Sequence, residues 1–198
     1  FTQSLGLAVG FVVSIIVSRV FGSEGKGAFS LVLSLATILF GISNLGLGFA
    51  SQYILSRRPS AIRGLFGNVL FYPVLASVLV VGGFVLGFPF WQQSFRGLTL
   101  AELKPAFMML PLMLVFEASC QLLVSLHQIG KRTIAVITQS GLVLIVTAIL
   151  IFSGTTATDA TYAYAFAWLV GGGLAVAFVI RFGGTPVHPS FRLFSETF

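Results

Sequence analysis

Charged side chains are scarce in this sequence. Asp, Glu, Lys and Arg together make up 8% of the chain, whereas a soluble domain usually carries about 25%. The single cysteine, Cys120, excludes an internal disulfide and a cysteine-bound metal. A membrane glycosyltransferase, polymerase or phosphatase needs several acids or histidines at one membrane face, and no such cluster is present. We therefore expect no enzyme, no catalytic residue, no metal site and no cofactor.

The sequence consists largely of long apolar runs. Hydrophobic residues make up 57% of the chain, and the mean hydropathy is +1.03. The runs are continuous, whereas the strands of a transmembrane β-barrel alternate in short segments. This pattern predicts an all-α, polytopic membrane helix bundle, because a bilayer is crossed by about 20 apolar residues in a helix. The expected transmembrane helices are six, at residues 2–18, 28–56, 64–88, 105–129, 133–153 and 162–180.

Basic residues are unevenly divided between the two ends of these helices. One end holds Arg57, Arg58, Arg63, Lys131, Arg132, Arg181 and Arg192. The other end holds Arg19, Lys26, Arg96 and Lys104. Cytoplasmic loops are enriched in Lys and Arg, so the first end is predicted to be cytoplasmic. We expect a multi-pass protein of the cytoplasmic (inner) membrane with its N-terminus in the cytoplasm. Its basic excess then reflects topology and contact with membrane lipids, and no nucleic-acid partner is expected.

Small and polar residues form a stripe along the expected helix 28–56. They follow one another at spacings of 4, 3, 4, 3, 4 and 3, which places them on one helical face. The members are Ser30, Ser34, Thr37, Gly41, Asn44, Gly48 and Ser51. A helix surrounded by lipid has no use for such a face, so we expect it to contact protein or water. Asn44 lies near mid-membrane, where it either lines a hydrated path or makes a hydrogen bond across a helix interface.

Glu117 is the unusual residue of the expected helix 105–129, because it lies near the centre of the bilayer. A carboxylate at that depth is costly unless it is paired, protonated or hydrated, and such residues are functional by default. Gln121, Ser125 and Gln128 continue the same face toward the cytoplasm. We interpret these four as one wall of a hydrated path, and Gln139 as a further candidate of the same kind. The alternative is a purely structural Glu117, held by a hydrogen bond or by an arginine from a second half of the protein outside this sequence.

Five basic residues at the cytoplasmic end are candidates for binding a phosphate-containing headgroup. They are Arg57, Arg58, Arg63, Lys131 and Arg132. The guanidinium group of arginine matches the geometry of phosphate oxygens, so this rim could collect a pyrophosphate headgroup from the inner leaflet. The alternative is ordinary anchoring of cytoplasmic loops by positive charge.

Small residues four apart occur on two other expected helices. The first set is Gly6, Gly10, Ser14 and Ser18, and the second is Ala163, Ala167, Gly171 and Ala175. Helices in membranes associate through close backbone approach, which small side chains permit. Both sets are therefore expected to be packing faces.

Three segments carry a resemblance to a known family. They are SRVFGSEGKGAFSLVLSL, ISNLGLGFASQYILSRR and LHQIGKRTIAVITQSGLVLIV, in this order along the chain. With them the sequence resembles the polysaccharide biosynthesis proteins, the O-antigen-type flippases of the multidrug/oligosaccharidyl-lipid/polysaccharide exporter superfamily. The resemblance covers nearly the whole chain as the first six helices of a larger protein. It implies that residues 1–198 form the N-terminal six-helix lobe of a MATE-like transporter.

The resemblance also implies a function in building the cell envelope. Such proteins move an undecaprenyl-pyrophosphate-linked glycan, for instance a lipopolysaccharide precursor, across the cytoplasmic membrane by alternating access, driven by H⁺ or Na⁺. The stripe of helix 28–56 and Glu117 would line this lobe, and residues 182–198 would lead to a seventh helix in the C-terminal half. The family's cavities are basic, whereas this chain places a single acid at mid-membrane.

Other functions fit the same sequence. A lipid II flippase, a teichuronic-acid exporter or a drug/cation exporter would share the fold. An enzyme of envelope polysaccharide synthesis would need catalytic residues outside this chain.

Overall fold

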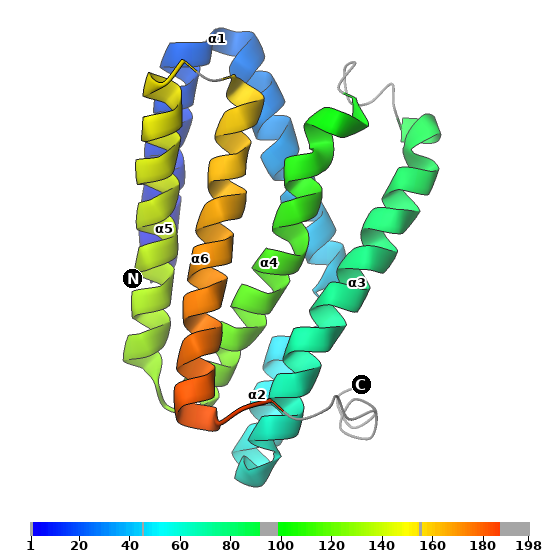
Figure 1. Ribbon diagram of the computed structural model, residues 1–198, viewed down its shortest axis with the longest axis vertical. Coiled ribbons are helices and arrows are strands. Elements are labelled where there is room, and N and C mark those ends of the chain that lie inside the picture. The colour runs from blue at the N-terminus through cyan, green and yellow to red at the C-terminus, as the bar shows by residue number, and fades with distance from the viewer. Residues whose placement is uncertain (1, 45, 92–98, 155, 187–198) are drawn as a thin grey trace.

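The computed structural model describes residues 2–44, 46–91, 99–154 and 156–186, and these form a bundle of helices (Figure 1). The elements are α1 (Thr2–Ser43), α2 (Leu47–Arg57), a short 3₁₀ helix η1 (Pro59–Ala61), α3 (Ile62–Trp91), α4 (Leu100–Ser125), α5 (Ile129–Phe152) and α6 (Ala157–Gly183). The prediction of an all-α membrane helix bundle is confirmed at this level. Five helical stretches are long and apolar enough to cross a bilayer, so the chain is a multi-pass membrane protein.

Helix α1 turns back on itself at Gly22. This residue has φ 67° and ψ −164°, a backbone conformation that is essentially restricted to glycine. Figure 1 shows the chain rising before this corner and descending after it. The two helices expected at residues 2–18 and 28–56 are thus separated within the expected interval, but the connection is a single glycine with helical conformation on both sides.

A second break divides the helix that was expected at residues 28–56. Helix α1 ends at Ser43 and α2 begins at Leu47. Between them Gly46 adopts the left-handed conformation, with φ 72° and ψ 13°. A continuous helix is wrong here, because a left-handed residue cannot continue a right-handed helix. The break lies in the middle of the expected span.

Helix α4 is the centre of the bundle. Over half of its most apolar stretch, 56%, is buried inside the molecule, against 22–39% for the other candidate spans. Phe116 of α4 packs edge-on against Trp168 of α6, with ring centroids 5.1 Å apart. Ala163, Ala167 and Ala175 of α6 are at most 1% exposed, which confirms the packing face expected on this helix. Helix α3, the least buried span, lies at the edge of the bundle (Figure 1).

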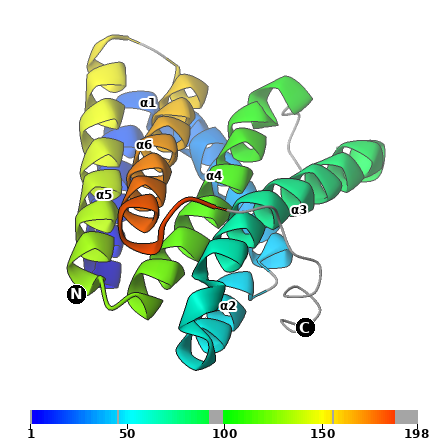
Figure 2. The same cartoon turned by 60° about the horizontal axis from the view of Figure 1, so that its bottom comes forward.

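Three connections bring the expected cytoplasmic residues to one end of the bundle. The α2–α3 junction, the α4–α5 junction and the end of α6 lie together there (Figure 2). A side chain at Gly183 of α6 would lie 2.9 Å from Ile62 of α3 and 3.3 Å from Leu126, which follows α4. The described basic residues of these junctions therefore share one end, as predicted. Arg96, Arg192 and residues 187–198 lie outside the described part of the chain.

Candidate functional site

Glu117 lies between two hollows in the helix bundle. Its position on α4 places it beside Gln121 one turn later, because residues four apart share a helical face. The side-chain amide Nε2 of Gln121 donates a hydrogen bond of 2.8 Å to Oε1 of Glu117. Glu117 lines a large pocket and also a small one, so a single carboxyl group borders both.

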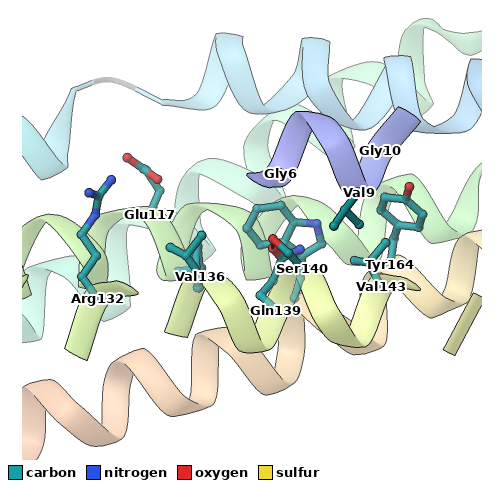
Figure 3. Close-up of a pocket in the computed structure, with 12 residues that line it drawn as sticks. Gly6, Val9, Gly10, Glu117, Arg132, Val136, Gln139, Ser140, Val143 and Tyr164 are labelled. Atoms are coloured by element: carbon teal, nitrogen blue, oxygen red, sulfur yellow. Dashed lines mark hydrogen bonds between the residues drawn. The ribbon is translucent and has the colours of Figure 1, made fainter. Parts of the chain in front are cut away.

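The large pocket has a volume of about 310 Å³ and lies among α1, α4, α5 and α6. Its lining is mostly apolar, with polar groups from three helices (Figure 3). The lining residues are Gly6, Val9, Gly10, Phe116, Glu117, Arg132, Val136, Gln139, Ser140, Val143, Tyr164 and Trp168. The size and the mixture of apolar walls with few polar groups are typical of a small-molecule site.

The two charged residues of this pocket lie at the same end of it. Arg132 enters from the first turn of α5 and Glu117 from the second half of α4 (Figure 3). The Nε atom of Arg132 is buried and has no hydrogen-bond partner among the described residues. A guanidinium group carries five N–H donors, so Arg132 in this position has donors to offer a ligand.

Polar and aromatic groups line the pocket beyond the charges. Gln139 is 8% exposed, and the hydroxyl of Ser140 donates a 3.3 Å hydrogen bond to its Oε1. Tyr164 lies at the end away from Arg132 (Figure 3). The structure therefore brings the predicted candidates Glu117 and Gln139 to one pocket. It adds Arg132, which the sequence analysis had assigned to the membrane rim.

Gly6 and Gly10 also belong to this pocket. Both were expected to pack closely against a neighbouring helix, yet a side chain at either position would meet no atom within 4 Å. The expected close contact with a neighbouring helix is wrong at both positions. Gly6 and Gly10 share a helical face with the buried Val13 and Val17, but at this end of α1 that face borders the pocket. The two glycines instead line the pocket without placing a side chain in it.

The small pocket connects Glu117 with the helix break. Its volume is about 10 Å³, and its polar lining comes from Ser43 and Asn44 at the end of α1 and from Glu117 and Gln121 on α4. Asn44 and Glu117 therefore border the same small pocket. Gly48 makes this close approach possible, since a side chain there would lie 2.8 Å from Cγ of Gln121.

The stripe that was expected along one helix is split by the break. Gly48 and Ser51 are buried against the bundle. The members on α1, namely Ser30, Ser34, Thr37 and Gly41, are exposed. The hydroxyl of Thr37 donates to the Leu33 carbonyl oxygen of its own helix at 2.9 Å. Within this chain, the α1 part of the stripe therefore faces outward.

Two residues were expected to extend the Glu117 face toward the cytoplasm, and only one of them lies on α4. Helix α4 ends at Ser125, and His127 has a positive φ of 59°. Gln128 therefore leaves the α4 face and becomes the residue before α5, so its assignment to that wall is wrong. Ser125 stays on α4, but its hydroxyl donates to the Gln121 carbonyl oxygen at 3.1 Å. It lines a separate pocket of about 470 Å³ near His127.

The other rim candidates lie at the end of the bundle. Arg57 is stacked over the ring of Tyr53 at 4.4 Å from its centroid, and Arg58 lines the same shallow pocket. Arg63 lies beside Gly184, which follows α6. The ammonium group of Lys131 lies 5.5 Å from the ring centroid of Phe178. These four remain candidates for headgroup contact, whereas Arg132 points into the bundle.

The signal that could have separated Arg132 from its neighbours is helical periodicity. Four residues of α5 follow one another at spacings of 4, 3 and 4 and line the large pocket, namely Arg132, Val136, Gln139 and Val143.

Compared with models of protein families, with curated sequences and with solved structures, the chain gives no match.

Proposed function

We propose that this chain is one lobe of a membrane flippase that moves a lipid-linked oligosaccharide across the cytoplasmic membrane. Transport proceeds by alternating access and is coupled to H⁺ or Na⁺. The lobe has six transmembrane helices and packs against a second lobe in a MATE-like arrangement. The substrate is an undecaprenyl-pyrophosphate-linked glycan used in the cell envelope.

The geometry of α1 supports six crossings. The apolar stretch from Gly6 to Arg57 has 52 residues, and a straight helix of that length would extend about 78 Å. The hydrocarbon core is only about 30 Å thick. The reversal at Gly22 divides α1 into two arms, residues 2–21 and 23–43 (Figure 1). With 20 and 21 residues, each arm extends about 30 Å, which is enough for one crossing.

The observation that carries the proposal is the position of Glu117. It is the 18th of the 26 residues of α4, the most buried span, and borders two hollows, with Arg132 on one side and Asn44 on the other. Ionisable groups at this depth mark pathways for ions and substrates. A carboxyl group that changes partners as it gains or loses a cation is suited to couple an ion gradient to a conformational change.

The exposed faces of the chain are consistent with contact to lipid on one side and to a partner lobe on another. Large hydrophobic residues such as Phe11, Leu79 and Phe90 are exposed, as expected for contact with lipid. The exposed small and polar residues of α1 form a different kind of face, which suits a hydrated cleft between two lobes. The arginines at the α2–α3 junction lie at the cytoplasmic mouth of this cleft, where they meet the pyrophosphate headgroup.

Replacing Glu117 by Gln tests the proposal. The change keeps size and hydrogen-bonding capacity but removes the ionisable group. In cells whose only copy of the full-length protein carries the change, Glu117→Gln is expected to abolish surface glycan. Labelled lipid-linked precursor then accumulates on the cytoplasmic leaflet.

The matched control is Glu24→Gln, because Glu24 is exposed near the α1 corner and borders neither hollow. Both variants must reach the membrane at the wild-type level, measured by immunoblot of membrane fractions. Wild-type export by Glu117→Gln would exclude Glu117 from the mechanism. Normal export after deletion of the whole protein would refute the proposed function.

A further inference from the structure

Two opposite charges line the large pocket without pairing with each other. Glu117 and Arg132 lie at the same end of it (Figure 3). Although both side chains belong to the described part of the chain, no hydrogen bond or ion pair joins them. The Nε atom of Arg132 is buried and has no partner among the described residues. A buried donor without a partner is costly, and it points to a ligand or water position.

The pocket is too large for water alone to be its natural occupant. Its volume of about 310 Å³ lies at the lower end of the range of small-molecule sites, about 300–1,000 Å³. From the two charges toward Tyr164, the wall is formed largely by apolar side chains such as Val136 and Val143 (Figure 3). A ligand that fits this pocket therefore has a charged end and an apolar body.

The pocket adjoins surfaces that contact lipid. Gly6 and Gly10 of α1 form part of its wall, and the neighbouring Leu7 and Phe11 are exposed. On α5, Ile137 is exposed beside Val136, which lines the pocket. Large apolar side chains exposed on a membrane helix contact acyl chains. An amphiphile from the bilayer is therefore the ligand at hand.

The depth of the two charges matches that of a lipid headgroup drawn slightly into the membrane. Glu117 lies about 12 Å along α4 from its end at Ser125, at a rise of 1.5 Å per residue, and Arg132 lies in the first turn of α5. Helix α4 has 26 residues and is about 39 Å long, so its ends extend beyond the hydrocarbon core of about 30 Å. Both charges lie in the leaflet at this end of the bundle.

The signs of the charges select the headgroup. Guanidinium groups bind phosphate oxygens, and carboxylates bind ammonium groups. An anionic headgroup without an amine would be repelled by Glu117, whereas a ligand with only positive charge would be repelled by Arg132. A zwitterion that carries both a phosphate and a primary amine satisfies the two side chains together.

We propose that the large pocket binds a phospholipid of the phosphatidylethanolamine class, with its phosphate at Arg132 and its ammonium group at Glu117. The apolar walls hold part of its acyl chains. The bound lipid fills the space beside Gly6 and Gly10 and so stabilises the first arm of α1 against α5. This inference goes beyond the proposed transport function, because binding depends only on residues of this chain.

Lipid binding is measured on the purified full-length protein in detergent by native mass spectrometry. Phosphatidylethanolamine, phosphatidylglycerol and phosphatidylcholine are added with the same acyl chains. Phosphatidylethanolamine is expected to bind most tightly, because phosphatidylglycerol lacks an amine and the quaternary ammonium group of phosphatidylcholine has no N–H to donate to Glu117. Equal dissociation constants for the three lipids would overturn the proposal.

A water-soluble probe separates a lipid from a free zwitterion. Glycerophosphoethanolamine carries the same headgroup without acyl chains. It is expected to leave bound phosphatidylethanolamine in place at equal concentration, because it lacks the contacts with the apolar walls. Displacement at equal concentration would overturn the assignment to a lipid.

Two substitutions locate the headgroup. Glu117→Gln is expected to raise the dissociation constant of phosphatidylethanolamine on the order of tenfold, while phosphatidylglycerol binds as before or more tightly because the repulsion is removed. Arg132→Gln is expected to weaken the binding of both lipids, since both carry a phosphate. A general loss of structure would not produce this split. An unchanged preference for phosphatidylethanolamine in Glu117→Gln would refute the site.

The matched control is Arg181→Gln. Arg181 is an exposed arginine in the last turn of α6, at the same end of the bundle, and it does not line the pocket. Its dissociation constants should equal those of the wild type, and a loss of lipid binding as large as in Arg132→Gln would refute the assignment to Arg132. If no lipid preference is found while glycan export still depends on this protein, the site fails and the proposed function stands.

Discussion

At the scale of single residues, the surroundings of Glu117 come from residues on two sides of α4. Arg132 lines the large pocket with it, and Asn44 lines the small one. A sequence places Glu117 at mid-membrane, because depth follows from counting residues along an apolar run. The sequence does not show that Arg132 lines the same pocket as Glu117, since this depends on how α5 is rotated against α4.

Close packing at Gly171 gives the first prediction. A Cβ atom at this position would lie 2.6 Å from Cβ of Gln139 and 3.3 Å from the ring of Phe116. Gly171→Ala therefore forces α6 away from α5, and such overpacking usually costs about 1–3 kcal/mol. The measurement is the thermal unfolding midpoint in detergent, which should fall.

The neighbouring glycine on α6 provides the control for this substitution. A side chain at Gly173 would meet no atom within 4 Å. Alanine has a higher helix propensity than glycine by about 1 kcal/mol, so Gly173→Ala should leave the midpoint unchanged or raise it. Equal midpoints for the two variants would contradict the packing of α6 against Gln139.

At the scale of elements, the two breaks in the first 57 residues shape the molecule. Gly22 reverses the chain, and Gly46 interrupts its descent. The sequence contains both glycines, but it contains twenty others. Most of those lie inside helices, where glycine is tolerated, and so composition alone does not show which glycine turns the chain. Helices α3 to α6 were easier to predict, because each is one long apolar run between polar ends.

The corner at Gly22 gives the second prediction. Gly22→Ala adds a side chain where no atom lies within 4 Å, so any loss of stability comes from the backbone. A non-glycine residue in such a conformation costs about 1–3 kcal/mol. We expect a lower thermal unfolding midpoint, and lower yield in the membrane fraction.

A matched control lies in the same corner. A side chain at Gly27 also meets no atom within 4 Å, and this residue has no positive φ. Gly27→Ala should therefore retain wild-type stability. If Gly22→Ala is as stable as Gly27→Ala, the reversal does not depend on the conformation of Gly22.

At the scale of the whole molecule, the α1 corner and the α5–α6 connection lie at one end of the bundle, and the α2–α3 junction lies at the other (Figure 1). This arrangement gives the third prediction. Single cysteines at Ser23 and Ser60, both exposed, should be labelled from opposite sides of the membrane by a thiol reagent that does not cross it. With Cys120 replaced by Ser, Ser23→Cys should react in intact cells and Ser60→Cys only in inverted vesicles.

Ser153→Cys completes the topology experiment, because Ser153 is exposed at the end of α5. It should react from the same side as Ser23→Cys. Labelling of Ser23→Cys and Ser60→Cys from one side would refute the single crossing between them, which the second arm of α1 makes together with α2. Opposite labelling with Ser60→Cys outside would keep the six helices and invert the proposed orientation.

The sequence by itself determined that this is an all-α membrane protein, because the length and hydrophobicity of its helices depend only on local composition. It also determined that Glu117 is the exceptional charge, since depth is read along one helix. Only the tertiary structure decided which helices meet around it. The small pocket of Ser43, Asn44, Glu117 and Gln121 requires α1 to break beside α4, and this depends on one left-handed glycine and on the contacts of distant segments. Packing between segments far apart in the chain leaves no local pattern, and so these contacts become visible only in the folded molecule.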